Sequence, residues 1–466
     1  MKEPRLEDVQ IRRLRALLER REISSHELVK AALQRIEQLN PHLNAFTQVR
    51  EEEALTEAHR LDQARGQGPP LPLLGIPMSV KDLIETRELP TTAGSRVFGE
   101  GFTSRYDATL VHRLKRAGAI LIGKTNLHEF AYGVTGENSH FGPARNPWDP
   151  SRIAGGSSGG SGVAVAAGMG CFSIGTDTRG SIRIPSSFCG ITGLKPTLGA
   201  VPTRGVIPLS GTLDHAGPMT RSVADAETVF DVIRDRRRQN PPPLGARLRI
   251  GVPDALMRGI DNEIRRAVLG AIDELSSLGH CICPIDIPEL EESVEASRAI
   301  AGSEAVVYHQ QWIEKNRSGY DQSVLARLET GFDVPAHELV QAFQLQRRLR
   351  SRLRRVFRQV DCLAGASVPV FPRLLEAAQQ EMDGRLSEVI DLVRLNAPSN
   401  VAGVPALVFP CGSSGGLPIA LQLIAPWQRE DILFALGKQY QDVTEWHCRK
   451  PPTDSVAKRG QLTQDL

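Results

Sequence analysis

The sequence predicts an α/β fold, because helical and strand patterns alternate in two separate parts of the chain. In the first part, a helix over 108–117 ends at Gly118 and leads into an apolar strand over 119–122. In the second part, a strand over 247–253 precedes a helix over 262–278 and a strand over 281–286. The 466 residues are 41% hydrophobic, which is enough to bury a large core in one large domain or in up to three smaller ones.

The N-terminal segment is predicted to be scaffold without chemistry of its own. Ser24 and Glu27 form a capping box that starts a helix, and we expect Pro41 to end it. The apolar spacing predicts further elements, which are a helix over 5–20, a strand over 44–49 and a helix over 51–66.

The second half of the chain is predicted to be helical over 290–360 and to close with a hairpin. Seven arginines cover the polar faces of 343–360, which leaves open a nucleic-acid-facing helix or a solvated face on a core-packed helix; we favour the latter. The turn GSSGG joins two strands at 406–411 and 419–425, and a last helix runs over 430–443. The remaining connections are a loop over 202–220, before a helix that starts near Ser222, and a basic, proline-rich linker over 234–245.

Composition excludes several classes of protein. The net charge of +2 gives no general attraction to nucleic acid or to anionic membranes. No run of about 18 apolar residues predicts a membrane span, and the N-terminus lacks the apolar core of a signal peptide. The seven cysteines are odd in number and irregularly spaced, so we expect reduced thiols and a cytoplasmic protein. His128 and His140 lack the spacing of a metal site, and we expect no metal and no organic cofactor.

The stretch from Ala154 to Thr197 has the composition of a catalytic loop, with serines set among glycines. A phosphate cradle is a weak interpretation, because GGSSGGSG lacks the GK[ST] ending of a P-loop. A nucleophile elbow at Ser157 is also weak, because no strand precedes it. Ser181, by contrast, follows a strand over 171–175 and a polar turn that includes Asp177, and it would be presented at the edge of a sheet.

A nucleophilic serine needs a base, and two residues are candidates. Lys81 leaves the end of an apolar strand over 77–80, on the same face as Ser79. If its site is dry, burial lowers the pKa of this lysine toward neutrality; the alternative is a strand-end lysine that reaches water. His215, beside a Gly-Pro pair in the predicted loop, is the weaker candidate.

Five motifs, in this order, resemble the amidase signature family. The likeness runs from about residue 5 to 448, and its motifs are GIPMSVKD, AGGSSGGSGVAVAAG, GTDTRGSIRIPSSFCGITGLKPT, TLDHAGP and GLPIALQLI. The resemblance implies one large α/β domain over 1–449 with a mixed central β-sheet covered by helices on both faces, followed by a polar tail over 450–466. Within the family, the chain looks closest to the AtzE-type branch, which includes carboxybiuret hydrolase and is related to the A subunit of glutamyl-tRNA(Gln) amidotransferase.

The resemblance also implies a Ser-Ser-Lys triad. Ser181 matches the nucleophile, Lys81 matches the base, and Ser157 matches the bridging serine, which in the family follows a cis peptide bond. The family's oxyanion hole matches four backbone amides, those of Thr178, Arg179, Gly180 and Ser181.

Position 179 departs from the family pattern, where the residue is usually Gly or Asn. One hypothesis is that Arg179 binds a substrate carboxylate; the alternatives are a side chain turned to solvent or an inactive relative. We expect an amidase that converts small linear amides or ureides to carboxylate and ammonia through an acyl-enzyme. The alternative is the amidase subunit of a glutamine-dependent tRNA amidotransferase. The expected partner is a small-molecule amide, a homodimer or a small partner subunit remains open, and neither a membrane nor nucleic acid is expected.

Overall fold

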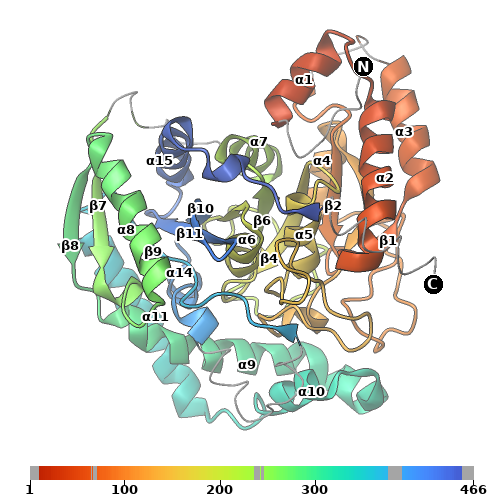
Figure 1. Cartoon of the computed structure of the whole chain (residues 1–466). Helices are drawn as coiled ribbons and strands as arrows, with labels where there is room; N and C mark the ends of the chain where they lie inside the picture. Colours follow the sequence, from red (N-terminus) through yellow and green to blue (C-terminus); the bar gives the residue numbers. More distant parts are fainter. Residues whose placement is uncertain are drawn as a thin grey trace.

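An eleven-stranded mixed sheet organises the molecule (Figure 1). The computed structural model describes residues 10–64, 66, 71–235, 242, 246–375 and 391–453. The strands lie in the order β1-β3-β2-β4-β6-β5-β10-β11-β9-β7-β8. Their bounds are β1 (Phe46–Val49), β2 (Pro77–Lys81), β3 (Ile120–Thr125), β4 (Phe172–Asp177), β5 (Thr192–Lys195), β6 (His215–Thr220), β7 (Arg249–Pro253), β8 (Cys281–Ile285), β9 (Cys362–Ala366), β10 (Ala406–Ser414) and β11 (Leu417–Ile424).

Parallel pairing occupies two regions of the sheet and antiparallel pairing its middle. β3, β2 and β4 are parallel, as are β9, β7 and β8, whereas β4, β6, β5, β10, β11 and β9 pair antiparallel in turn. The first parallel group follows from the predicted helix–strand unit, since parallel neighbours need a crossover between them. Because β2 and β4 run side by side, their carboxyl ends meet at one edge, where open α/β sheets bind ligands.

Helices cover both faces of the sheet, as the sequence resemblance implies (Figure 1). α5 and α6 pack together over β4 and β5, while α7 and α15 pack together and contact β5 and β10. The helix bounds are α1 (Ile11–Glu19), α2 (Ser25–Leu43), α3 (Glu51–Gln63), α4 (Thr109–Arg116), α5 (Gly159–Ala166), α6 (Arg183–Cys189), α7 (Val223–Ile233), α8 (Asn262–Ser277), α9 (Glu289–Asn316), α10 (Gln322–Glu329), α11 (Ala336–Val356), α14 (Ala397–Ala402) and α15 (Glu430–Val443).

Two predictions of local structure are wrong. Pro41 does not end its helix, because α2 continues to Leu43 and closes at Asn44 in the left-handed conformation. A proline so near the carboxyl end interrupts only the last turn of the helix. The segment 202–220 is not all loop, because 215–220 forms β6 between β4 and β5. Gly217 and Pro218 hide this strand from a propensity argument.

Other predicted elements fall partly or wholly outside the described residues. These are the start of the helix over 5–20, most of the linker over 234–245 and most of the tail over 450–466. Within the tail, Thr453 is buried and its hydroxyl accepts a hydrogen bond of 2.6 Å from Arg35. The domain boundary at 449 stays a prediction.

The arginine-rich helix α11 packs on α9 with its apolar stripe inward, as Leu349 and Leu353 are buried. On its polar side, Arg348 forms an ion pair with Glu292 at 3.0 Å, and Arg354 stacks on the ring of Trp427. These contacts support the interpretation of a solvated face.

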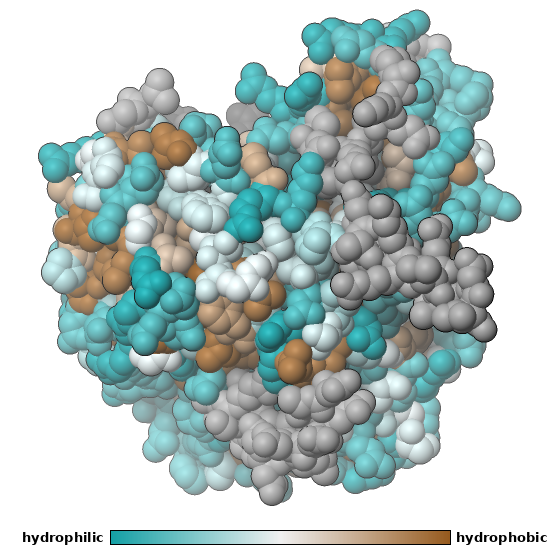
Figure 2. Space-filling view, viewed as in Figure 1, coloured by the Kyte–Doolittle hydropathy of each residue, from teal (hydrophilic) through white to brown (hydrophobic). Residues whose placement is uncertain are grey.

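The surface carries only scattered apolar residues. On the face seen in Figure 2, apolar residues form small separate patches among polar ones. None of the helices among the described residues is long and apolar enough to cross a membrane. All seven cysteines lie in the described residues and are free thiols.

Candidate active site

The candidate site lies where the parallel strands β2 and β4 end. Lys81 is the last residue of β2, and the register pairs Val80 with Ile174 of β4. The residues that follow this pair, Lys81 and Thr176, therefore come together at the edge of the sheet, where Lys81 is fully buried. This excludes the alternative of a strand-end lysine that reaches water.

Two hydroxyl groups hold the Lys81 amine. Nζ donates to Ser157 Oγ at 2.7 Å and to Thr176 Oγ1 at 2.8 Å. Burial lowers the pKa of Lys81 from 10.5 to about 7, against the opposing effect of the Asp214 and Asp177 carboxylates. Near neutral pH, a large fraction of this amine is therefore unprotonated and has a lone pair.

Ser157 follows a cis peptide bond, as the resemblance implies for this position. The backbone around it is fixed from the loop that follows β3. Gly156 N–H donates to Val134 O at 2.6 Å, and His128 N–H donates to Ser157 O at 3.1 Å. Ser157 is fully buried, so these contacts hold its hydroxyl against Lys81.

Ser181 lies in the short connection between β4 and α6, and its side chain is open to a ligand. Its Oγ makes no hydrogen bond to any described residue, whereas its carbonyl accepts one from Ser158 N–H at 3.2 Å. The structure thus brings Lys81 and Ser157 into direct contact and ties Ser181 to them through the backbone. Hydrogen bonds among catalytic groups are often formed only once substrate is bound.

The turn before Ser181 differs in one respect from the predicted oxyanion hole. Gly180 N–H donates to Asp177 Oδ1 at 2.8 Å, so this amide already has an acceptor. The amides of Thr178, Arg179 and Ser181 have no acceptor among the described residues. Three of the four predicted donors are therefore free to bind an oxyanion.

Asp177 organises this turn through a buried ion pair. Arg183 Nε donates to Asp177 Oδ2 at 3.0 Å, and both side chains are fully buried. Burial alone would raise the pKa of Asp177, but the Arg183 guanidinium and the Asn400 amide hold it well below its usual range. The remaining donors of Arg183 reach α14 and β11, through Ser399 and Gln422.

A second carboxylate braces the other side of the turn. Asp214 accepts hydrogen bonds from Thr178 Oγ1 at 2.6 Å and from the backbone of Leu209 and Ser210. Burial raises the pKa of Asp214 to about 6. Its neighbour His215 is buried, with Nδ1 2.7 Å from Leu213 O, and burial holds the pKa of this imidazole well below its usual value. His215 makes no hydrogen bond to the candidate serines, which supports Lys81 as the base.

Arg179 turns toward α9 and away from bulk solvent. Its Nε donates to Ser297 Oγ at 2.9 Å. Burial lowers the pKa of Arg179 to about 10, so the guanidinium stays charged at neutral pH. The alternative of a side chain directed to solvent is therefore wrong.

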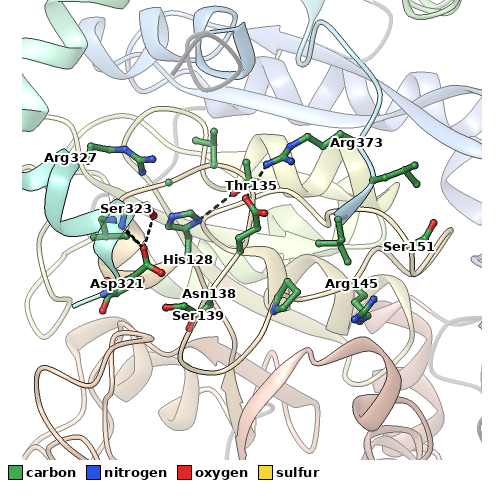
Figure 3. A pocket seen from close by; sticks show the side chains of 18 residues that line it. His128, Thr135, Asn138, Ser139, Arg145, Ser151, Asp321, Ser323, Arg327 and Arg373 are labelled. Atoms are coloured by element: carbon green, nitrogen blue, oxygen red, sulfur yellow. Dashed lines mark hydrogen bonds and ion pairs between the residues drawn. The ribbon is translucent and has the colours of Figure 1, made fainter. Parts of the chain in front are cut away.

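A cavity of 620 Å³ lies behind the cis peptide (Figure 3). His128 and Val134, whose backbones hold Ser157 and Gly156, belong to its lining, together with Arg327 and Arg373. None of Lys81, Ser157 and Ser181 lines it. The loop between the cavity and the serines contains Phe130 and Ala131 at positive φ, 48° and 59°, a conformation that is uncommon for residues with a side chain.

Sequence reasoning missed several residues of the site. Thr176 contacts Lys81, Ser297 contacts Arg179, and Asp214 contacts Thr178. Only Thr176 had a usable signal, because it directly precedes Asp177 at the end of a predicted strand. Ser297 lies 118 residues from Arg179, and nothing in the local pattern marks it.

No three His, Cys, Asp or Glu side chains in the described ranges group closely enough to hold a metal ion. A serine beside a buried lysine, with free backbone amides around it and an unreactive histidine, defines the class of lysine-dependent serine hydrolases.

Comparison with known proteins identifies the family. The family model Amidase matches residues 27–434, so the chain belongs to the amidase family, whose members hydrolyse amides. The A subunit of glutamyl-tRNA(Gln) amidotransferase from Chromohalobacter salexigens is 34% identical to it, over 96% of this chain and 99% of that protein.

Two solved structures extend the likeness. One belongs to a vestigial protein complex that reveals the origins of an s-triazine catabolic enzyme; it is 34% identical, with a TM-score of 0.86 over 93% of this chain and 98% of that one. The native peptide amidase of Stenotrophomonas maltophilia is 30% identical, with a TM-score of 0.80 over 96% of this chain and 98% of that one.

Proposed function

We propose that this protein is an amidohydrolase that cleaves the C–N bond of small linear amides or ureides through an acyl-enzyme on Ser181. The observation that carries this proposal is the contact of 2.7 Å between Lys81 Nζ and Ser157 Oγ, with a lysine whose pKa is about 7. A serine hydroxyl is a weak nucleophile, and a neutral lysine in a dry site is a suitable base.

In the first half of the reaction, neutral Lys81 takes a proton from Ser157 while Ser157 takes one from Ser181. Ser181 Oγ then attacks the amide carbonyl. The negative charge that develops on the carbonyl oxygen is stabilised by the free amides of Thr178, Arg179 and Ser181, and each such donor typically lowers the barrier by about 3 kcal/mol.

In the second half, Ser157 gives its proton to the leaving nitrogen and regains one from Lys81. The C–N bond breaks, ammonia leaves, and an ester on Ser181 remains. Water then attacks this ester with the same proton transfers, which releases the carboxylate and restores the Ser181 hydroxyl. The sum is one amide and one water converted to one carboxylate and one ammonia.

A second candidate function is the amidase component of a glutamine-dependent tRNA amidotransferase. The name of the curated relatives supports it, since the relatives of Chromohalobacter salexigens and Roseiflexus castenholzii both carry it, at 34% and 38% identity. It would require a partner subunit that passes the released ammonia to a charged tRNA. Arg179, at a position where the family resemblance leads us to expect a small residue, supports a different substrate.

An ammonia-release screen tests the proposal, with glutamine, neutral linear amides, anionic linear amides and ureides as substrates and Ser181→Ala as the blank. We expect release from a linear amide or ureide by the isolated chain. Glutamine hydrolysis that rises strongly with a co-purified partner would favour the amidotransferase. Equal rates for wild type and Ser181→Ala would reject both.

A further inference from the structure

The guanidinium of Arg179 lacks a negatively charged partner. Its single hydrogen bond to a described residue is from Nε to the neutral hydroxyl of Ser297, and no carboxylate forms an ion pair with it. A poorly solvated charge without a counter-ion costs free energy, so such an arrangement is typical of a binding site for an ion of opposite sign.

The charges around Arg179 are mostly positive. After burial, the neighbours that act on its pKa are Tyr132, Arg327, Glu295 and Arg298. Glu295 does not neutralise Arg179, because it pairs with Arg298, whose other partner is Glu338.

Arg327 brings a second cation to the same place. It extends from α10 over the ring of Tyr132, with its Cζ 5.6 Å from the ring centroid, and donates a hydrogen bond to Tyr132 O. Arg327 also lines the cavity of 620 Å³, where its side chain is visible in Figure 3. Tyr132 is buried, and burial raises the pKa of its phenol, which therefore keeps its proton.

The position of Arg179 relates this positive group to the nucleophile. Only Gly180 separates Arg179 from Ser181, and the Arg179 amide is one of the three free donors of the turn. A substrate whose carbonyl lies at Ser181 can therefore place a second group near the Arg179 guanidinium only if the chain between them is short.

We propose that Arg179 and Arg327, on either side of Tyr132, form a subsite for a carboxylate carried by the substrate. This inference rests on the proposed amidohydrolase and names its substrate class as monoamides of short dicarboxylic acids and ureides that carry a carboxylate. Guanidinium groups suit this task because they bind both carboxylate oxygens at once. The same charges disfavour an α-ammonium group and therefore disfavour glutamine.

The kinetic test compares malonamic, succinic and glutaric acid monoamides with the corresponding neutral diamides. For the best anionic amide, we expect kcat/KM at least 30-fold above that of its diamide. Arg179→Gln removes the charge and keeps the backbone amide, so it should lose this preference while its rate on the diamide changes less than threefold. Arg298→Gln is the matched control, because Arg298 already has two carboxylate partners, and it should keep the preference.

Binding gives a readout that does not depend on catalysis. Ser181→Ala should bind malonate or succinate in calorimetry, and the added Arg179→Gln should weaken binding at least tenfold. If Arg179→Gln does not fold, as judged by circular dichroism, Arg327→Gln replaces it in both assays.

Hydrolysis of diamides and monoamides at equal rates, unchanged by Arg179→Gln, would overturn the subsite and leave the amidohydrolase intact. The absence of dicarboxylate binding to Ser181→Ala would also overturn the subsite. Hydrolysis of none of the amides would reject the proposed function, but binding of dicarboxylate to Ser181→Ala that depends on Arg179 would still support the subsite.

Discussion

At the scale of single residues, the chemistry depends on a lysine that loses its charge because it is dry. Lys81 is fully buried, and its nearest polar partners are two neutral hydroxyls rather than a carboxylate. A carboxylate in contact would keep the amine protonated, whereas hydroxyls orient it without doing so to the same extent.

The pH dependence of the reaction follows from the pKa of Lys81. The base is active when unprotonated, so kcat/KM should be constant well above pH 7 and fall about tenfold per pH unit below it. The measurement is the initial rate of ammonia release from pH 5 to 9. Lys81→Arg, which keeps the charge but cannot lose a proton near neutral pH, should be inactive throughout. A rate that is constant from pH 5 to 7 would exclude Lys81 as the base.

Thr176 should act as a positioning residue for Lys81. Its hydroxyl accepts one N–H of the amine and so directs the lone pair toward Ser157. We expect Thr176→Val to lower kcat by about tenfold to a hundredfold, the usual contribution of a positioned acid or base. The acid limb should also move to lower pH, because the lost acceptor favoured the charged form. Thr176→Ser should restore both; a Val variant with unchanged kcat would contradict the role.

The residue-scale site is predictable where the sequence pattern is local. Strand ends, glycine-rich turns and the family resemblance predict Lys81, Ser157 and Ser181, and their spatial relation agrees with that prediction. Thr176, Asp214 and Ser297 escape it, because their roles depend on contacts between segments that are distant in the sequence. The engagement of Gly180 with Asp177 depends on the local rotation of one peptide, which composition cannot reveal.

At the scale of elements, the turn between β4 and α6 is the part that must be rigid. The Asp177–Arg183 pair ties this turn to α14 and β11 through Ser399, Asn400 and Gln422. A fully satisfied buried network of this kind fixes the free amides in one orientation.

Removing one partner of this network should be costly. Arg183→Met leaves the Asp177 carboxylate buried without a cation, and we expect the free energy of unfolding to fall by about 3–5 kcal/mol. Urea denaturation measures this loss. The control is Arg249→Met, which breaks a partly exposed pair with Asp361 and should cost less than about 1 kcal/mol. Equal losses in the two variants would refute a structural role of the buried network.

The elements themselves are predictable to different degrees. The unit of β7, α8 and β8 matches its predicted bounds within two residues, because its hydrophobic periods are strong. The sequence predicts loop in place of β6, since Gly217 and Pro218 have low strand propensity, but the pairing of β6 with β4 and β5 outweighs that propensity. The continuation of α2 past Pro41 is also missed, because the expectation applies a rule for helix interiors to a final turn.

At the scale of the whole molecule, one continuous sheet joins the N-terminal and C-terminal halves. β5 of the serine-bearing region pairs with β10, so the strands that carry the site and the closing hairpin share one core. The α/β class is predictable from helix–strand alternation, but the strand order is not. The position of β9 between β11 and β7 depends on pairing between residues far apart in the sequence.

This shared core predicts a single cooperative unfolding transition. Trp312 lies on α9, whereas Trp148, Trp427 and Trp446 lie in other parts of the fold. Tryptophan fluorescence and far-ultraviolet circular dichroism should give coincident urea transitions. Two separate transitions would show that the halves unfold independently and would contradict a single domain.

The identity of the nucleophile is the central claim, and covalent labelling tests it most directly. A fluorophosphonate or sulfonyl fluoride should add once per chain, and peptide mass spectrometry should place the adduct on Ser181. Labelling should slow as the pH falls below 7 and should be absent in Ser181→Ala. An adduct that persists in Ser181→Ala, or a wild-type chain that is not labelled at pH 8, would contradict the account.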